Sequence, residues 1–229
     1  MNFYALKIAV AALVILGGLL AFPLGALAAA KRARRKYARI PLARDLTGAA
    51  VAGILLHREN LAGRVAVESG AATLGESYSP AAARITLADE SARGRSVYAA
   101  ATAAFLVAQV TLHADRDTDF VRSHGRRFAL VLTANILPPV FLFGVLVPGE
   151  GRLFLYILTP MLLCLLAGYT ILSVPAERHA ASRALALLER HGLVSGKPER
   201  EALRAALFAR AALALAAPLT RSFWFNWSL

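Results

Sequence analysis

The stretch Ser96–Ala114 constrains the fold of this chain more than any other stretch. It reads SVYAAATAAFLVAQVTLHA and has no charged side chain until His113. A helix drawn through it has no polar face, which is typical of a helix that is buried nearly all round. We therefore predict a buried central helix over residues 96–113.

The composition places this helix in a membrane protein. The chain has 229 residues, of which 58% are hydrophobic, and its mean hydropathy is +0.55. These values exceed those of a typical soluble domain. The formal net charge is +12. The basic residues lie beside apolar stretches, where anionic lipid headgroups and membrane topology account for them. The lipid bilayer is therefore the expected partner.

Two other function classes are disfavoured by the same composition. The chain has no motif that combines aromatic and basic residues in the way nucleic-acid-binding proteins do, so we expect no nucleic-acid partner. Its single cysteine, Cys164, lies inside an apolar stretch. A single cysteine in such a stretch excludes intrachain disulfides and cysteine-based metal sites.

Three apolar stretches are predicted to cross the bilayer. Residues 8–30 carry no charge and form the first, so residues 1–30 are predicted to be an N-terminal transmembrane anchor. A cleaved signal peptide is the alternative, because Ala26-Leu27-Ala28 has the form of a cleavage site. The basic segment KRARRKYAR follows at once and resists translocation, which favours the anchor. Residues 128–174 contain the other two spans as a short-turned hairpin.

The distribution of basic residues predicts the orientation. The positive-inside rule places residues 31–44 and the C-terminus in the cytoplasm, with the N-terminus and the turn of the hairpin outside. The abundance of Arg and Ala suggests a GC-rich bacterial gene. We therefore predict a multi-pass protein of the bacterial inner membrane. The charge rule favours a buried or interfacial position for residues 96–113. Residues 202–219 are interpreted as lying at the interface or packed on the spans, because Arg204 and Arg210 interrupt the apolar stretch.

The remaining residues are predicted to form two cytoplasmic regions. Residues 31–127 hold a helix that begins near Asp45 and ends near Arg58, followed by two alternating segments at 64–68 and 84–87. These segments predict a β-hairpin or two short paired strands. Pro175 is expected to end the third span, and residues 175–229 are predicted to form cytoplasmic or interfacial helices.

Several short strings, taken in order, resemble the neutral zinc metallopeptidases of the YugP type, a family of bacterial membrane-bound peptidases. Each string is weak alone, but their order and spacing over roughly residues 44–217 make the match more specific. The strings are Leu46-Thr47-Gly48-Ala49, Ser77-Tyr78-Ser79-Pro80, Gly94-Arg95-Ser96-Val97, Pro175-Ala176-Glu177 and Ser182-Arg183-Ala184-Leu185. The resemblance implies a small zincin-like α+β domain built round the central helix.

The chain departs from that family on the central helix. The family carries HExxH there, with two imidazoles that bind one Zn²⁺ and a Glu that activates the bound water. On this sequence the motif falls on Phe105, Leu106 and Gln109, which provide neither imidazole nor carboxylate. The resemblance implies that Glu177 retains the position of a third ligand, and that the His and Asp of a family turn are replaced by Ser77 and Ser79.

These observations lead to two functional hypotheses. The first is a catalytically inactive membrane relative of the zinc peptidases, acting as a scaffold, adaptor or accessory subunit beside other membrane proteins. It expects no catalytic residue, no cofactor and no bound metal, with Glu177 as a vestigial ligand position. The alternative is an active membrane zinc metallopeptidase with atypical ligands, His113, His179 and Glu177. The predicted fold class is a mainly α membrane protein with about three transmembrane helices and a small cytoplasmic α+β domain.

Overall fold

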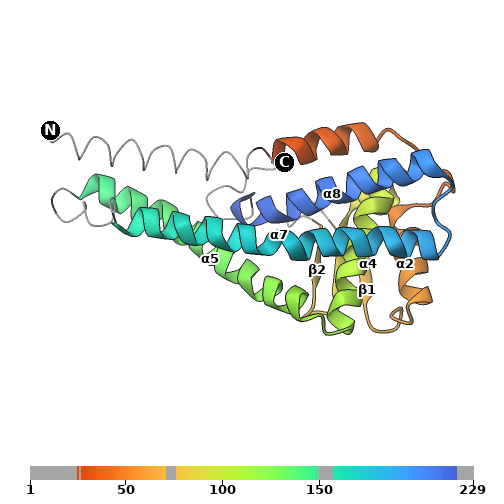
Figure 1. Cartoon of the computed structure of the whole chain (residues 1–229), viewed down its shortest axis with the longest axis horizontal. Helices are drawn as coiled ribbons and strands as arrows, with labels where there is room; N and C mark the ends of the chain where they lie inside the picture. The colour runs from red at the N-terminus through yellow and green to blue at the C-terminus, as the bar shows by residue number, and fades with distance from the viewer. Residues whose placement is uncertain (1–24, 26, 71–75, 148, 150–156, 221–229) are drawn as a thin grey trace. The chain divides into compact units, whose positions relative to one another are not determined.

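The computed structural model describes residues 25, 27–70, 76–147, 149 and 157–220. Contacts divide the chain into two compact units. One, called here the α+β unit, consists of Ala28–Arg122 and Pro175–Ala214. The other, the apolar unit, comprises Met1–Leu27, Ser123–Val174 and Leu215–Leu229, and only its described residues are discussed. Figure 1 traces the order of the elements along the chain.

The first labelled helix of the α+β unit, α2, spans Gly48–Arg58 and follows the basic helical residues 27–37. Its N-terminus is capped by Thr47, whose side-chain oxygen accepts a hydrogen bond from the amide of Ala50 at 3.2 Å. Such a cap satisfies one of the amide groups that a helix start leaves without a partner. The apolar side of α2 is buried, including Val51 and Leu55. The predicted helix is confirmed.

A three-stranded mixed sheet follows α2. Its strands are β1 (Ala66–Gly70), β2 (Ser77–Ser79) and β3 (Arg84–Ala88), in the order β1-β3-β2. The predicted pairing of the two alternating segments is confirmed, but the hairpin alternative is wrong, because β1 and β3 run parallel. The antiparallel neighbour of β3 is the short strand β2, which the sequence did not predict. Two parallel strands cannot be joined by a tight turn. The chain therefore runs back through β2 before it enters β3 beside β1.

The central helix α4 spans Val97–Ala114, after the short helix α3 (Asp89–Arg93). Ser96 caps α4 by accepting a hydrogen bond from the amide of Ala99 at 3.2 Å. Every residue from Val97 to Leu112 is buried, as the sequence predicted. The same hydrophobic cluster contains side chains of α2, the sheet and both C-terminal helices, among them Leu55, Ile85, Leu187 and Leu207. The core of the α+β unit is therefore built round α4.

Two long helices pass from one unit into the other. Helix α5 spans Thr118–Leu146 and contains Pro138 and Pro139, and α7 spans Thr159–Arg190. Helix α7 continues through Pro175, so this proline does not end the helix, and the end of a membrane span there stays a prediction. A proline inside a helix disturbs the hydrogen bonds of the preceding turn. There the carbonyl of Leu172 accepts a hydrogen bond from Nη1 of Arg126 at 2.7 Å, which gives this oxygen a partner outside its own helix.

Helix α7 ends at a tight turn, and α8 spans Lys197–Thr220. Gly192 has a φ of +65°, the left-handed conformation that commonly follows a helix and that glycine adopts without strain. Gly192 therefore follows the C-terminal end of α7 as its cap. Leu203, Ala206, Leu207 and Ala211 place one face of α8 in the core of the α+β unit.

The apolar unit exposes large hydrophobic side chains, including Leu132, Phe141, Leu146 and Ile171. A small buried cluster of Leu130, Ala134 and Leu166 joins α5 to α7. Of the described helices, Val97–Ala114 and Thr159–Arg190 are long and apolar enough to span a bilayer, and the first of these is mostly buried inside the protein. Length and composition do not establish membrane crossing, which stays a prediction. Most of the predicted anchor 1–30 lies outside the described residues.

Candidate functional site

The residues at the positions of the family's HExxH motif lie in the core of the α+β unit. Phe105 and Leu106 are 0% and 1% exposed, and Gln109 is 2% exposed. Phe105 and Gln109 are four residues apart, so they lie on one face of α4. Thr102 and Tyr98 continue this face toward the N-terminus of the helix and are also buried. The candidate site is this face of α4.

A buried arginine from α8 covers the aromatic ring on this face. Arg210 is 5% exposed, and its guanidinium carbon lies 5.6 Å from the centroid of the Phe105 ring. This distance allows a cation–π interaction, which is worth most when the cation has left water. A cation therefore lies beside Phe105, the residue that we predict at the position of the family's first zinc-binding histidine.

Glu76 is the anionic partner of this arginine. The Nη2 atom of Arg210 donates a hydrogen bond to the backbone oxygen of Glu76 at 2.8 Å. The Nε atom lies 3.7 Å from Oε2 of the Glu76 carboxylate, and the two side chains are only 6% and 11% exposed. Glu76 directly precedes Ser77, the residue that we predict at the position of the histidine in the family's turn. Arg210 thus contacts Phe105, which is predicted at one histidine position, and the residue before a second one.

Tyr98 completes the polar part of the site. Burial raises the pKa of its phenol, and the negative charge of Glu76 acts in the same direction, while Arg210 and Arg34 oppose it. The pKa of Tyr98 is therefore raised above the ordinary value of about 10 for a tyrosine. The phenol is therefore neutral near pH 7, and Arg210 and Glu76 are the charged pair at the centre of the site.

The three ligands of the atypical zinc site are not brought together. His113 lies at the exposed end of α4, where its Nδ1 is 2.9 Å from the hydroxyl of Tyr78. Glu177 is 2% exposed, whereas His179, two residues further along α7, is exposed. Residues two apart face different sides of a helix. Among the residues that the structure describes, no group of three His, Cys, Asp or Glu side chains could hold a metal ion.

The donor chemistry of the site does not fit a catalytic zinc ion. Such an ion needs three protein ligands and an open position for water. Phe105 and Leu106 offer no donor atom, and the amide of Gln109 is a poor replacement for imidazole. The Arg210 guanidinium also adds a positive charge, which would repel a second cation at short range. We therefore derive no reaction step through zinc.

The sequence predicted the apolar residues of this site but not Arg210 and Glu76. Arg210 was assigned to an interfacial helix because it interrupts an apolar stretch. Its partner is 134 residues away in sequence, and no local pattern connects the two. The signal that could have found the pair is the arginine itself, since a charged side chain within an apolar helix is buried only when it has a partner.

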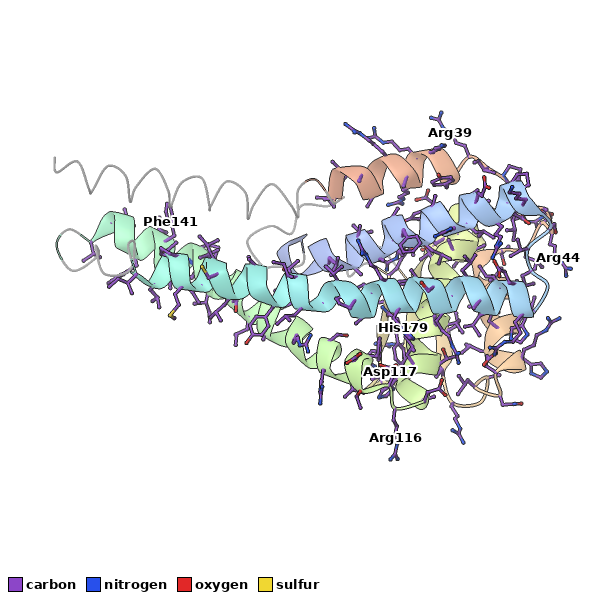
Figure 2. The ribbon with its side chains drawn as sticks, in the orientation of Figure 1. Arg39, Arg44, Arg116, Asp117, Phe141 and His179 are labelled. Atoms are coloured by element: carbon purple, nitrogen blue, oxygen red, sulfur yellow. The ribbon has the colours of Figure 1, made fainter. Side chains whose placement is uncertain are left out.

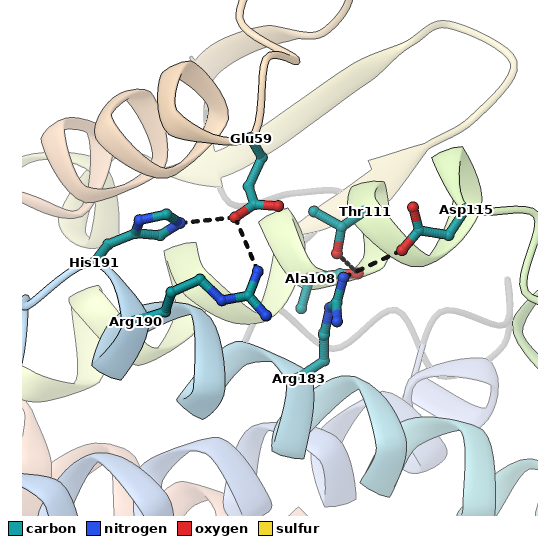
Figure 3. A network of polar contacts seen from close by, with 7 residues as sticks. All are labelled: Glu59, Ala108, Thr111, Asp115, Arg183, Arg190 and His191. Atoms are coloured by element: carbon teal, nitrogen blue, oxygen red, sulfur yellow. Dashed lines mark hydrogen bonds and ion pairs between the residues drawn. The ribbon is translucent and has the colours of Figure 1, made fainter.

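A second polar network lies at the ends of α4 and α7 (Figure 3). Arg183 donates from Nη2 to the carboxylate of Asp115 at 3.2 Å. Farther along α7, the carboxylate of Glu59 lies 2.7 Å from Nε2 of His191 and 3.7 Å from Nη1 of Arg190. The contacts of Glu59 hold the turn after α2 against the C-terminal end of α7.

The α+β unit has a buried central helix, and the chain continues from it into long apolar helices. Residues 12–224 match the family described as putative neutral zinc metallopeptidase. The chain belongs to this family. Comparison with curated proteins and with solved structures found no match.

Proposed function

We propose that this chain is a catalytically inactive, membrane-embedded member of its zinc peptidase family and serves as a scaffold, adaptor or accessory subunit of a membrane complex. The observation that carries the proposal is the buried Arg210 guanidinium above Phe105. An apolar ring and a fixed cation at the position of the first histidine leave no suitable place for zinc or its activated water.

The exposed apolar side chains support the membrane part of the proposal. Leu132, Phe141, Leu142 and Leu146 are each at least half exposed on α5. Soluble monomers rarely expose contiguous apolar surface, and lipid or a membrane partner is the usual cover. We place the protein in the bacterial inner membrane, with the N-terminus outside, the C-terminus in the cytoplasm, and other membrane proteins as its partners.

Metal analysis of the purified full chain tests the inactive state. After incubation with zinc and removal of unbound metal, we expect zinc far below one ion per chain, and no zinc-dependent cleavage of a generic peptide substrate. Glu177→Ala should change neither result. Its matched control is Glu201→Ala, which removes an exposed carboxylate on α8. Stoichiometric zinc that is lost in Glu177→Ala but kept in Glu201→Ala would overturn the proposal.

Purification in mild detergent tests the scaffold role separately. We expect at least one other membrane protein to co-purify with the full chain in a defined ratio, and to do so equally with the Glu177→Ala variant. A chain that is inactive and metal-free but always purifies alone would contradict the scaffold role while leaving the inactive state in place.

A further inference from the structure

A groove on the α+β unit combines a basic rim with an apolar floor. Its volume is about 720 Å³, within the range of small ligand sites. The basic side chains at the groove are Arg44, His57 and Arg58. The other residues that line it are Leu46, Gly53, Ile54 and Leu193. We call it the α2 groove, because most of its lining belongs to α2 and the segment leading into it.

Two arginines of the α2 groove converge on the turn after α7. Nη1 of Arg58 donates a hydrogen bond to the backbone oxygen of His191. Nη2 of Arg44 lies 3.8 Å from the position that a Cβ atom on Gly192 would occupy. Figure 2 shows Arg44 beside this turn. The guanidinium of Arg58 is therefore bonded to this turn, and the guanidinium of Arg44 lies close to it.

The positive charge at this turn exceeds the negative charge. Within the described parts of the chain, no carboxylate lies within ion-pair distance of Arg44 or Arg58. Glu59 is already in contact with His191 and Arg190. The nearby Glu199 accepts hydrogen bonds from the backbone amides of Ala43 and Ser195. An occupant of the groove would supply the missing negative charge.

We propose that the α2 groove binds an acidic segment of a partner protein, with carboxylates on Arg44 and Arg58 and an apolar side chain on the floor between them. Guanidinium groups suit carboxylates because both are planar and can form paired hydrogen bonds. The apolar floor distinguishes this site from one for a simple inorganic anion, which would gain nothing from Leu46 or Ile54. The proposal rests on the scaffold function for its biological role.

The order of the chain favours a protein over a lipid headgroup as the occupant. Leu193 follows the C-terminal end of α7, whereas the apolar part of that helix, residues 159–174, comes first in the sequence. The proposed topology places the α+β unit in the cytoplasm, where segments of other proteins can reach it. A lipid headgroup is the alternative that the experiment below distinguishes.

A binding experiment with the full chain in zwitterionic nanodiscs tests the proposal. The probe is a fluorescently labelled decapeptide of alternating Glu and Leu, and its affinity is read from anisotropy after subtraction of empty nanodiscs. We expect saturable binding that weakens with salt, as contacts between exposed charges do. The same peptide with Lys in place of Glu should not bind.

Two variants examine the two halves of the α2 groove. Arg44→Glu reverses one charge of the rim and should weaken binding by about tenfold or more. Gly53→Leu fills the groove without removing a charge, and should weaken binding to a similar degree. No atom lies within 4 Å of a Cβ placed on Gly53, so this change should not lower the unfolding temperature. The control, Arg64→Glu, changes an exposed arginine outside the groove and should leave affinity within about twofold.

Three results would overturn the proposal. Unchanged peptide affinity in Gly53→Leu would mean that the groove is not the site. Equal losses in Arg44→Glu and Arg64→Glu would indicate attraction to overall charge alone. Binding of water-soluble dihexanoyl phosphatidylglycerol that depends on Arg44, without binding of the peptide, would identify a headgroup site. Each result is independent of co-purification, so failure of this proposal and failure of the scaffold role can be told apart.

Discussion

At the scale of single residues, Arg210 is a charged side chain buried in the α+β unit. Its guanidinium is almost removed from water, and the compensation comes from the Glu76 backbone oxygen, the Glu76 carboxylate and the face of Phe105. Burying an ion is costly unless it is paired and hydrogen-bonded. The pair therefore affects the free energy of unfolding mainly when one member is removed, because the other charge is then buried without its partner.

Arg210→Ala should destabilise the protein by about 3 kcal/mol, because it leaves the largely buried Glu76 carboxylate without its cation. Arg210→Met with Glu76→Gln should recover part of this loss, since it removes both charges and keeps similar volumes. The unfolding temperatures of the wild type, of Arg210→Ala and of the double variant are measured on the full chain in detergent. A double variant as unstable as Arg210→Ala would contradict the electrostatic explanation.

Arg204→Ala provides the matched control for that series. Arg204 lies on the same helix but is exposed, and its guanidinium carbon is 5.9 Å from the ring of Phe208. An exposed cation–π contact is worth about 0.5–1 kcal/mol, so the variant should lose no more than that. A loss equal to that of Arg210→Ala would mean that α8 tolerates no truncation of an arginine.

At the scale of whole elements, sequence patterns predicted the helices better than the sheet. The helix start at Thr47, the apolar face of α2 and the unbroken apolar stretch of α4 are local signals, and the structure confirms both helices. The parallel register of β1 with β3 depends on the return of the chain through β2, which is only three residues long. Such a strand is too short to show an alternating pattern. The continuation of α7 through Pro175 likewise had no local signal, because a proline commonly marks the end of a helix.

Two glycines of α2 should respond in opposite ways to alanine. A Cβ on Gly48 would lie 2.2 Å from the backbone oxygen of Ser91, at the close approach of α2 to α3. Gly48→Ala should therefore cost about 3 kcal/mol or more, since backbone cannot move aside cheaply. At Gly53 the same atom meets nothing within 4 Å. Gly53→Ala should stabilise the helix by about 0.5–1 kcal/mol.

Thermal unfolding of the two alanine variants measures this contrast within one helix. The comparison removes any general effect of alanine on helix propensity, because both substitutions are the same and both lie inside α2. Equal shifts of the unfolding temperature in both variants would contradict the tight packing of α2 against α3.

At the scale of the whole molecule, each of the two units is built from segments that are far apart in the sequence. The α+β unit takes its residues from both sides of Ser123–Val174, so α7 and α8 complete a core that begins with α2. If Ser123–Val174 crosses the membrane twice as a hairpin, the chain leaves and re-enters the same compartment. Only an even number of crossings is compatible with a single folded α+β unit, and this agrees with the predicted orientation.

Cysteine labelling in intact cells tests that orientation. In a Cys164→Ser background, Val147→Cys near the hairpin turn should react with a membrane-impermeant maleimide added from outside. Arg39→Cys and Ser195→Cys, both in the α+β unit, should react only after the inner membrane is opened, because the positive-inside rule places that unit in the cytoplasm. The reverse pattern would invert the topology. Labelling of all three positions from the same side would show that the hairpin does not cross, and the exposed apolar side chains of α5 would then need a protein partner as their cover.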